Sequence, residues 1–178
     1  ALKNLRARSF YLEILLENFI DEILTDLELS RANLLYSGGG HAYLILPNTD
    51  NVKRYLDEIE VRMNKWLCET FDIDLYLAMG YEACSPLNLQ NKPAGSYKQM
   101  FINASHTLSG KKRKRNSYEQ IQALNDRAVK DDTRECRICH RSDRVDSDGV
   151  CGVCNGLIRL SKGILDKDIF CITGKETE

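Results

Sequence analysis

A glycine-rich turn between two short apolar runs is the feature that most constrains the fold of this 178-residue chain. The turn spans Ser37–His41 and reads Ser-Gly-Gly-Gly-His, and the flanking apolar runs cover residues 32–36 and 42–46. This order is typical of a β-hairpin. Three glycines exceed what a tight turn needs, so we expect the backbone here to approach another group closely, such as a phosphate or another chain. The turn contains no carboxylate.

Apolar residues at helical spacing lie on both sides of the hairpin in the sequence. The spacing predicts one helix over residues 5–29 and a second helix that is capped by Thr49 or Asp50. A third strand is predicted at Leu75–Tyr81. The order α-β-β-α-β needs only one opening strand to become the ferredoxin-like arrangement. We therefore expect an α+β domain over residues 1–85, within a fragment of a longer protein whose opening strand is missing.

Three further segments are expected after this domain: a helical connector with a basic run (86–133), a cysteine module (134–157), and a closing helix and strand (158–178). In the connector, Ser96 is expected to cap a short helix, and Ser117-x-x-Gln120 has the form of a capping box. A short helix near Leu157–Leu160 and a strand at residues 168–173 are predicted to close the chain.

The strongest chemical signal is the spacing Cys136-x2-Cys139-x11-Cys151-x2-Cys154. A Cys-x-x-Cys pair lets two thiolates reach one ion, and two such pairs complete a tetrahedral sulfur shell for Zn²⁺. Four cysteines leave no open position for a water molecule. The module therefore predicts a structural rather than a catalytic zinc.

Two other uses of this module remain open from the residues alone. Cys136-x-x-Cys-His140 matches the attachment pattern of a c-type haem, which would need an exported protein and would leave the second cysteine pair unexplained. His140 could also replace one cysteine as a ligand.

The other cysteines, Cys68, Cys84 and Cys171, lie in apolar sequence and are expected to be small core residues. An odd count of seven cysteines without a signal peptide favours a reducing, cytoplasmic compartment.

The overall charge of −1 gives no electrostatic reason to expect nucleic acid binding by the chain as a whole. A local exception is the basic run Lys111–Arg115, which either contacts phosphates or forms a solvated surface. Arg6 and Arg8 likewise either contact phosphates or belong to a solvated surface. No apolar stretch reaches the roughly 18–20 residues that span a bilayer, so no membrane partner is expected.

Carboxylates for phosphoryl transfer are missing where a palm would place them. Two-metal chemistry needs clustered carboxylates, and the hairpin offers Gly40 and His41 instead. Asp72 and Asp74 flank the third predicted strand, where solvation at a helix end explains them. No His-Asp dipeptide marks a nuclease site. We therefore predict no catalytic residue in this chain.

Three stretches together resemble one known family: Leu5–Leu12 (LRARSFYL), Leu34–Ala42 (LLYSGGGHA) and the cysteine module. Over essentially its whole length the chain resembles the large subunit of type III-A CRISPR effector complexes, the Csm-type cyclic oligoadenylate synthase. Members of that family carry an HD nuclease domain, a first palm, a zinc-bearing domain, a second palm and a helical C-terminal domain. The resemblance implies that residues 1–85 are the first palm, a ferredoxin-like domain of the nucleotidyl-cyclase type, and that residues 158–178 lead toward a second palm absent from this sequence. The resemblance implies an antiviral protein that converts ATP into cyclic oligoadenylates and cleaves single-stranded DNA.

The catalytic palm of that family carries a Gly-Gly-Asp-Asp hairpin that holds Mg²⁺. Aligned on its glycines, the present hairpin has glycine and histidine where the acids would stand, and neither is a hard ligand for Mg²⁺. The resemblance thus implies a non-catalytic palm that is inactive alone. In it, Ser37 donates a hydrogen bond to a phosphate or ribose, and the glycine N–H groups of the turn come close to ATP. The expected ATP-pocket residues are Ser37, Gly38, Gly39, Gly40 and His41.

The resemblance also implies partners, namely ATP with Mg²⁺ in the intact protein, guide RNA, target RNA and other Csm subunits. Two alternatives stay open. One is a non-catalytic scaffold that binds RNA or protein through the basic run. The other is a relative of the GGDEF-type nucleotidyl cyclases, to which the zinc module is foreign.

Overall fold

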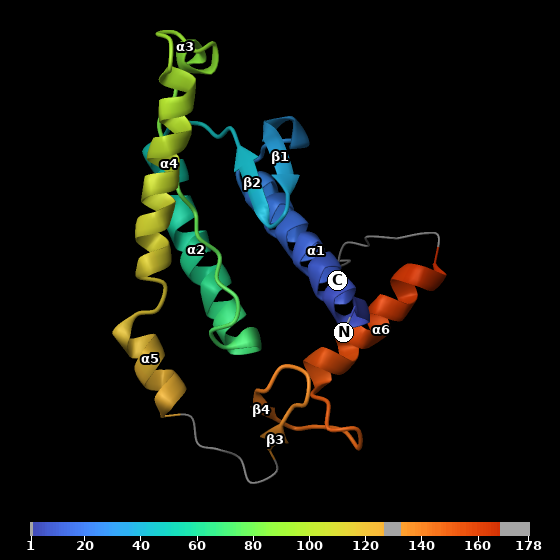
Figure 1. Ribbon diagram of the computed structural model, residues 1–178. Coiled ribbons are helices and arrows are strands. Elements are labelled where there is room, and N and C mark those ends of the chain that lie inside the picture. Colours follow the sequence, from blue (N-terminus) through green and yellow to red (C-terminus); the bar gives the residue numbers. More distant parts are fainter. Residues whose placement is uncertain (1, 127–132, 168–178) are drawn as a thin grey trace. The chain divides into compact units, whose positions relative to one another are not determined.

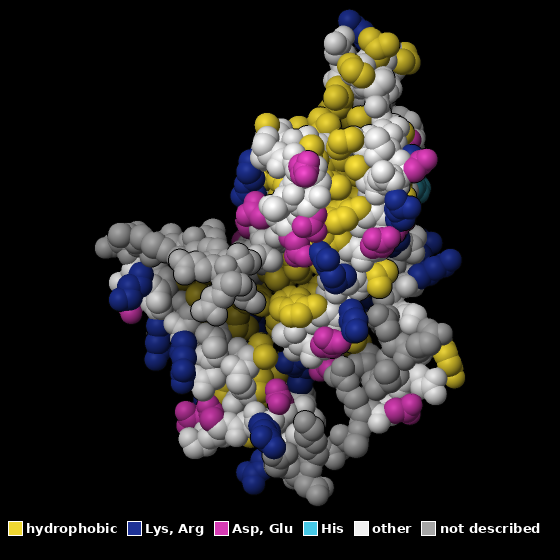
Figure 2. Space-filling view, turned by 180° about the vertical axis from the view of Figure 1, so that it is seen from behind, with side chains coloured by type: hydrophobic (Ala, Val, Ile, Leu, Met, Phe, Trp, Pro, Cys, Tyr) yellow, Lys and Arg dark blue, Asp and Glu magenta, His cyan; other side chains and the backbone are white. Residues whose placement is uncertain are grey.

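The computed structural model describes residues 2–126 and 133–167, and these residues form helices and two small antiparallel sheets (Figure 1). The chain divides into two compact units, Ala1–Leu44 with Ala128–Glu178, and Ile45–Arg127. Charges of both signs are interspersed on the face seen in Figure 2. Among the described helices, none is both long and apolar enough to cross a membrane.

The first unit is built on α1 (Leu2–Asp26), which packs against α6 (Gly152–Asp166). Its buried side chains include Phe19, Ile20, Ile23 and Leu24. The other elements of the unit are η1 (Arg31–Asn33), β1 (Leu34–Gly38), β2 (His41–Leu44), β3 (Arg134–Glu135) and β4 (Ser142–Asp143).

Helix α1 ends three residues earlier than the apolar spacing predicts. Glu28 adopts a left-handed φ of 55°, and the Leu29 N–H donates to the Leu24 carbonyl at 2.8 Å. This is the hydrogen bond of a helix C-terminal motif that satisfies carbonyls left open by the last turn. Ser30 then caps η1, because its hydroxyl accepts the Ala32 N–H at 3.3 Å.

The predicted hairpin is confirmed, with β1 antiparallel to β2 and Gly38 opposite His41. Gly39 and Gly40 form its two-residue turn with φ of 59° and 76°. Positive φ at both central residues is what a type I′ turn requires, and glycine adopts it without steric cost. A register irregularity lies between Leu34 and Tyr36.

The second unit contains α2 (Asp50–Phe71), α3 (Pro86–Leu89), α4 (Ser96–Arg113) and α5 (Tyr118–Asn125). Thr49 caps α2, its hydroxyl accepting the Val52 N–H at 3.3 Å, so one of the two predicted capping residues is confirmed. The buried apolar residues of α2 fall at helical spacing: Val52, Leu56, Ile59, Met63, Leu67 and Phe71.

The strand predicted at Leu75–Tyr81 does not form in the described structure. Asn64 of α2 accepts the Leu77 N–H and donates to the Leu77 carbonyl, both at 2.8 Å, and Glu60 accepts the Met79 N–H at 2.8 Å. Side chains of a helix thus satisfy backbone groups that a neighbouring strand would otherwise pair. The prediction of a strand is wrong here because an apolar run does not say what will pair its backbone, and side chains of α2 pair it without a sheet.

Helix α4 is longer than predicted and begins differently. Gly95, at φ 89°, occupies the position before the first turn, so Ser96 is not the cap. The helix runs through Arg113 and includes the first three residues of the basic run. Segment Leu75–Tyr81 passes very close to α4, because a Cβ on Gly80 would lie 2.6 Å from the Ala104 carbonyl oxygen. The closing strand predicted at 168–173 lies outside the described residues.

Replacing Asn64 by Ala should destabilise the second unit by about 1–3 kcal/mol, because two backbone groups of Leu77 lose their partner. Hydrogen exchange at the Leu77 amide should accelerate, and urea unfolding gives the free-energy change. Asn48→Ala, at an exposed asparagine, is the control. Equal effects of the two substitutions would show that Asn64 does not hold this segment.

Candidate functional site

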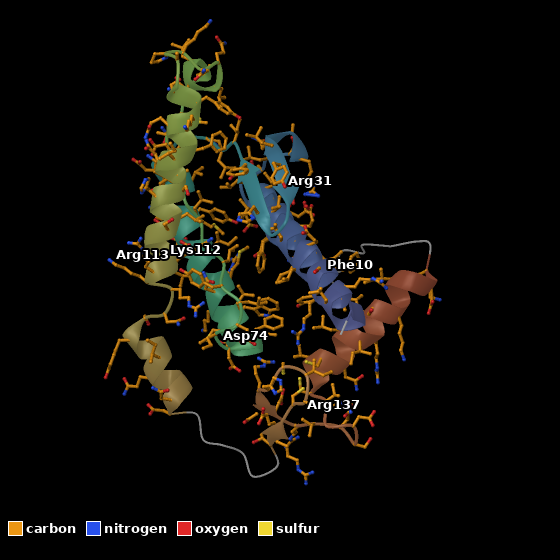
Figure 3. The ribbon with its side chains drawn as sticks, in the orientation of Figure 1. Phe10, Arg31, Asp74, Lys112, Arg113 and Arg137 are labelled. Atoms are coloured by element: carbon orange, nitrogen blue, oxygen red, sulfur yellow. The ribbon has the colours of Figure 1, made fainter. Side chains whose placement is uncertain are left out.

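Four sulfur atoms converge in the first unit. The Sγ atoms of Cys136, Cys139, Cys151 and Cys154 all lie within 4.8 Å of one another. None forms a disulfide, and Cys139 and Cys151 place their sulfurs 3.7 Å apart. The cluster lies between the β3–β4 hairpin and the first turn of α6 (Figure 3). Cys139 is half-buried and the other three are buried, so the geometry is that of a closed site that could hold one metal ion.

The two cysteine pairs are shaped by different local structure. In the first, the Cys136 N–H donates to the Arg141 carbonyl at 2.9 Å, and the His140 N–H donates to the Cys136 carbonyl at 2.8 Å. In the second, Cys151 caps α6, and its sulfur accepts the Cys154 N–H at 3.5 Å. The Cys151 N–H donates to the Cys136 sulfur at 3.3 Å, which ties the two pairs together.

The thiols of this cluster have opposite pKa shifts. Burial acts to raise the pKa of Cys136, but backbone hydrogen bonds from Cys139, Cys151 and Ile138 lower it to about 6. Burial, and then hydrogen bonds with Cys139 and Cys151, raises the pKa of Cys154 to about 12. Four crowded sulfurs therefore do not all ionise on their own. A divalent cation would supply the charge that lets them bind as thiolates.

Asp146 organises the second cysteine pair, and the sequence reasoning missed it. One carboxylate oxygen accepts the N–H groups of Asp148 and Val150, both at 2.9 Å, and the other accepts the Asn155 side chain at 2.9 Å. These bonds fix the turn that delivers Cys151. The signal was present in the sequence as Asp-x-Asp-Gly, a typical turn pattern in which the first side chain bonds backbone two residues on.

His140 lies away from the sulfurs. Its ring is exposed and pairs with Glu135 through Nδ1 at 3.0 Å. The alternative in which His140 replaces a cysteine is therefore not supported, and neither is a haem pattern that uses only the first pair, since all four sulfurs meet. Of the other cysteines, Cys68 is half-buried and Cys84 is exposed, so the prediction of a core position for Cys84 is wrong. Cys171 lies outside the described residues.

The expected ATP-pocket residues lie at the tip of the β1–β2 hairpin, against α1. The Ser37 hydroxyl donates to Glu17 Oε1 at 2.6 Å, and the Gly39 N–H donates to Glu13 Oε1 at 3.1 Å. His41 Nδ1 lies 2.9 Å from the Gly39 carbonyl oxygen. The donors expected to face a phosphate thus face carboxylates of α1 in this structure.

Arg31 connects the hairpin base to the same face of α1 (Figure 3). It forms ion pairs with Glu17 and with Asp21, the latter at 3.2 Å. The sequence analysis did not single out these acids, although Glu13, Glu17 and Asp21 recur every four residues and so share one helix face.

The basic run divides into an anchored residue and exposed ones. Lys111 pairs with Glu60 and, at 3.3 Å, with Asp57 of α2. Burial acts to lower its pKa, but hydrogen bonds and charge from these two carboxylates raise it. Lys112 and Arg113 are exposed at the end of α4 (Figure 3). Arg6 and Arg8 are exposed on α1.

The two aspartates considered for catalysis lie at and just beyond the C-terminal end of α2. Asp72 ends α2 at a positive φ of 55°, and Asp74 is exposed beyond it. The helix-end position expected from the sequence is what the structure has, with Asp74 exposed and Asp72 half-buried.

Comparison with protein families gives a direct match. The family described as Csm1 subunit domain B matches residues 1–127. The chain belongs to the Csm1 family. The resemblance to the large subunit of type III-A complexes is thereby confirmed, and the GGDEF-type alternative is not supported.

Curated Csm1 relatives align over nearly the whole chain. One from Enterococcus italicus is 43% identical over 174 residues, covering 97% of this chain and 23% of the relative. One from Mycobacterium tuberculosis is 41% identical over 180 residues, covering 92% and 22% respectively. Both are named CRISPR system single-strand-specific deoxyribonuclease Cas10/Csm1 (subtype III-A). The chain thus spans about a quarter of the length of these relatives.

Solved Csm1 structures share the fold. A Csm1-Csm4 cassette in complex with one ATP is 35% identical with a TM-score of 0.57, covering 72% of this chain and 18% of that one. The apo cassette is 35% identical with a TM-score of 0.52, covering 70% and 17%.

Substituting Cys136 by Ser should remove the bound metal and unfold the cysteine module, because a closed tetrahedral site fails when one of its four ligands is lost. Mass spectrometry of the native protein, with elemental analysis, measures the metal content. His140→Ala is the matched control and should keep about one metal per chain, as a four-thiolate site requires. Metal loss in the control would bring the histidine back as a ligand.

Asp146→Ala should weaken metal retention against a competing chelator and cost about 1–3 kcal/mol of stability, since three hydrogen bonds to its carboxylate disappear. Asp148→Ala removes an exposed carboxylate from the same turn and should leave both properties near those of the parent. If the chelator removes the metal from both variants at the same rate, the role given to Asp146 is refuted.

Proposed function

We propose that this chain is the first palm and the zinc module of the large subunit of a type III-A CRISPR effector complex. In this role its hairpin forms one wall of an ATP pocket and performs no chemistry itself. The observation that carries the proposal is the hairpin tip, where Gly40 and His41 stand in place of acids in a member of the Csm1 family. Support for ATP as the ligand comes from the related cassette in complex with one ATP.

The palm is proposed to be ferredoxin-like, over residues 1–85. The order α1, β1, β2, α2 supports this fold, because it matches the inner part of the β-α-β-β-α-β unit. The sheet would be completed by a strand from elsewhere in the protein. A connector at 86–133, a cysteine module at 134–157 and a closing segment at 158–178 are proposed to follow the palm.

The metal of the cysteine module is proposed to be structural Zn²⁺, held by Cys136, Cys139, Cys151 and Cys154. Four sulfur ligands in a closed, largely buried site favour zinc over hard cations, which prefer oxygen. A magnesium ion that serves ATP would need carboxylates outside this hairpin, and the second palm of the intact protein would supply them.

The whole protein is proposed to convert ATP into cyclic oligoadenylates and to cut single-stranded DNA in the cytoplasm. Support for the first activity comes from Csm1-Csm4 cassettes in complex with cA3 and cA4, and for the second from the names of the curated relatives. Other Csm subunits are the expected protein partners. Guide and target RNA are proposed partners of the assembled complex, and the exposed residues of the basic run, Lys112–Arg115, are the surface most suited to phosphate contacts.

The isolated chain should make no cyclic oligoadenylate from ATP and Mg²⁺, because the hairpin itself carries no carboxylate. In the full-length protein, Gly40→Ala should strain the turn at φ 76° and reduce oligoadenylate synthesis several-fold, chiefly through KM for ATP.

Gly110→Ala is the control, since an added Cβ meets open space at either glycine and only Gly40 has a positive φ. Chromatography of products from radiolabelled ATP measures both effects. Robust synthesis by the isolated chain would overturn the proposal, and so would equal kinetics for the two alanine variants.

A further inference from the structure

The outer face of the β1–β2 hairpin carries two exposed aromatic rings. Tyr36 and Tyr43 are 53% and 45% exposed, and they stand opposite one another in the strand register. Their ring centroids are 6.2 Å apart, with the planes inclined at 43°. Because side chains alternate along a strand, the next pair, Gly38 and His41, lies on the same face.

Gly38 leaves room for the Tyr36 ring beside the turn. It has no side chain, and a Cβ there would lie 3.0 Å from the Tyr36 hydroxyl oxygen, so the tyrosine lies directly over the glycine. The result is an aromatic surface that ends at the glycine turn. Nucleobases stack on such surfaces through their π-faces, whatever their hydrogen-bonding pattern.

The opposite side of the hairpin presents its donors to acids. Ser37 and the Gly39 N–H, which would otherwise donate to phosphate oxygens, are bonded to Glu17 and Glu13 at 2.6 and 3.1 Å. A phosphate at this turn would have to displace two carboxylates from the donors it needs.

The local charge also disfavours a phosphate. Glu13, Glu17 and Asp21 share one face of α1, and the cation that pairs with this group, Arg31, already contacts two of them. A triphosphate carries several negative charges, and a like charge a few ångströms away in a partly buried site lowers affinity about tenfold or more. A neutral base is not repelled, and ribose hydroxyls are donors that carboxylates accept.

We propose that the hairpin takes the adenine end of ATP, with the base stacked on the Tyr36–Tyr43 face and the triphosphate directed away from Glu13 and Glu17. The inference rests on the proposed function, which places ATP at this hairpin. It assigns the Ser37 and Gly39 donors to holding the turn on α1 rather than to binding phosphate.

Two photoreactive ATP analogues test which end of the nucleotide lies at the hairpin. One carries an azide on the adenine ring, and the other carries an azidoanilide on the γ-phosphate. Each is cross-linked to the full-length protein, and labelled peptides are identified by mass spectrometry. The base-linked probe is expected to label peptides from the hairpin, and the γ-linked probe is expected to label other peptides.

Variants sharpen this assignment. Tyr43→Leu should reduce base-probe labelling of the hairpin about fivefold or more, in line with the loss of one base–aromatic stack. Tyr36→Phe keeps the ring and should stay within about twofold of the parent. Tyr118→Leu, at a tyrosine that is 74% exposed in the second unit, is the control.

The outcomes separate the two proposals. Hairpin labelling by the γ-linked probe, alone or as strongly as by the base-linked probe, overturns the adenine assignment and leaves ATP at the hairpin. Base-probe labelling that survives Tyr43→Leu unchanged also overturns the assignment. If neither the base-linked nor the γ-linked probe labels the hairpin, the proposed ATP site itself is overturned.

Discussion

Two hydrogen bonds between the hairpin turn and the carboxylates of α1 determine what this chain can do at its candidate nucleotide site. Ser37 bonds Glu17 and the Gly39 N–H bonds Glu13. The turn is thereby fixed on the long helix, and its donors are turned toward acids. A palm that carried out phosphoryl transfer would need its carboxylates on the hairpin, where they hold metal ions. Here the acids lie beneath the turn and act as acceptors for it.

The second unit satisfies its backbone in an unusual way. Asn64 and Glu60 of α2 take the positions of a neighbouring strand for Leu77 and Met79. Glu60 also pairs with Lys111, so one buried carboxylate joins α2, the segment beside it and α4. Such a group is stable only when its partners are all present, because an unpaired buried carboxylate carries a large desolvation cost.

The sequence was most informative where geometry follows from local chemistry. A two-residue glycine turn specifies its hairpin, a threonine before an amphipathic run specifies a helix start, and the paired Cys-x-x-Cys spacing brings four sulfurs together. The outcome at Leu75–Tyr81 could not be foreseen, because an apolar run does not say whether a strand or helix side chains will pair its backbone. A contact between distant residues, such as that of Glu13 with the turn, likewise depends on tertiary structure.

The measurement that tests the central claim most directly is a crystal structure of the full-length protein with ATP and Mn²⁺, using anomalous scattering to locate manganese. The account predicts ATP density beside Tyr36 and Tyr43, with no manganese peak at Ser37–His41 or at Glu13 and Glu17. A manganese ion coordinated by these acids, with the triphosphate against the glycine turn, would contradict it.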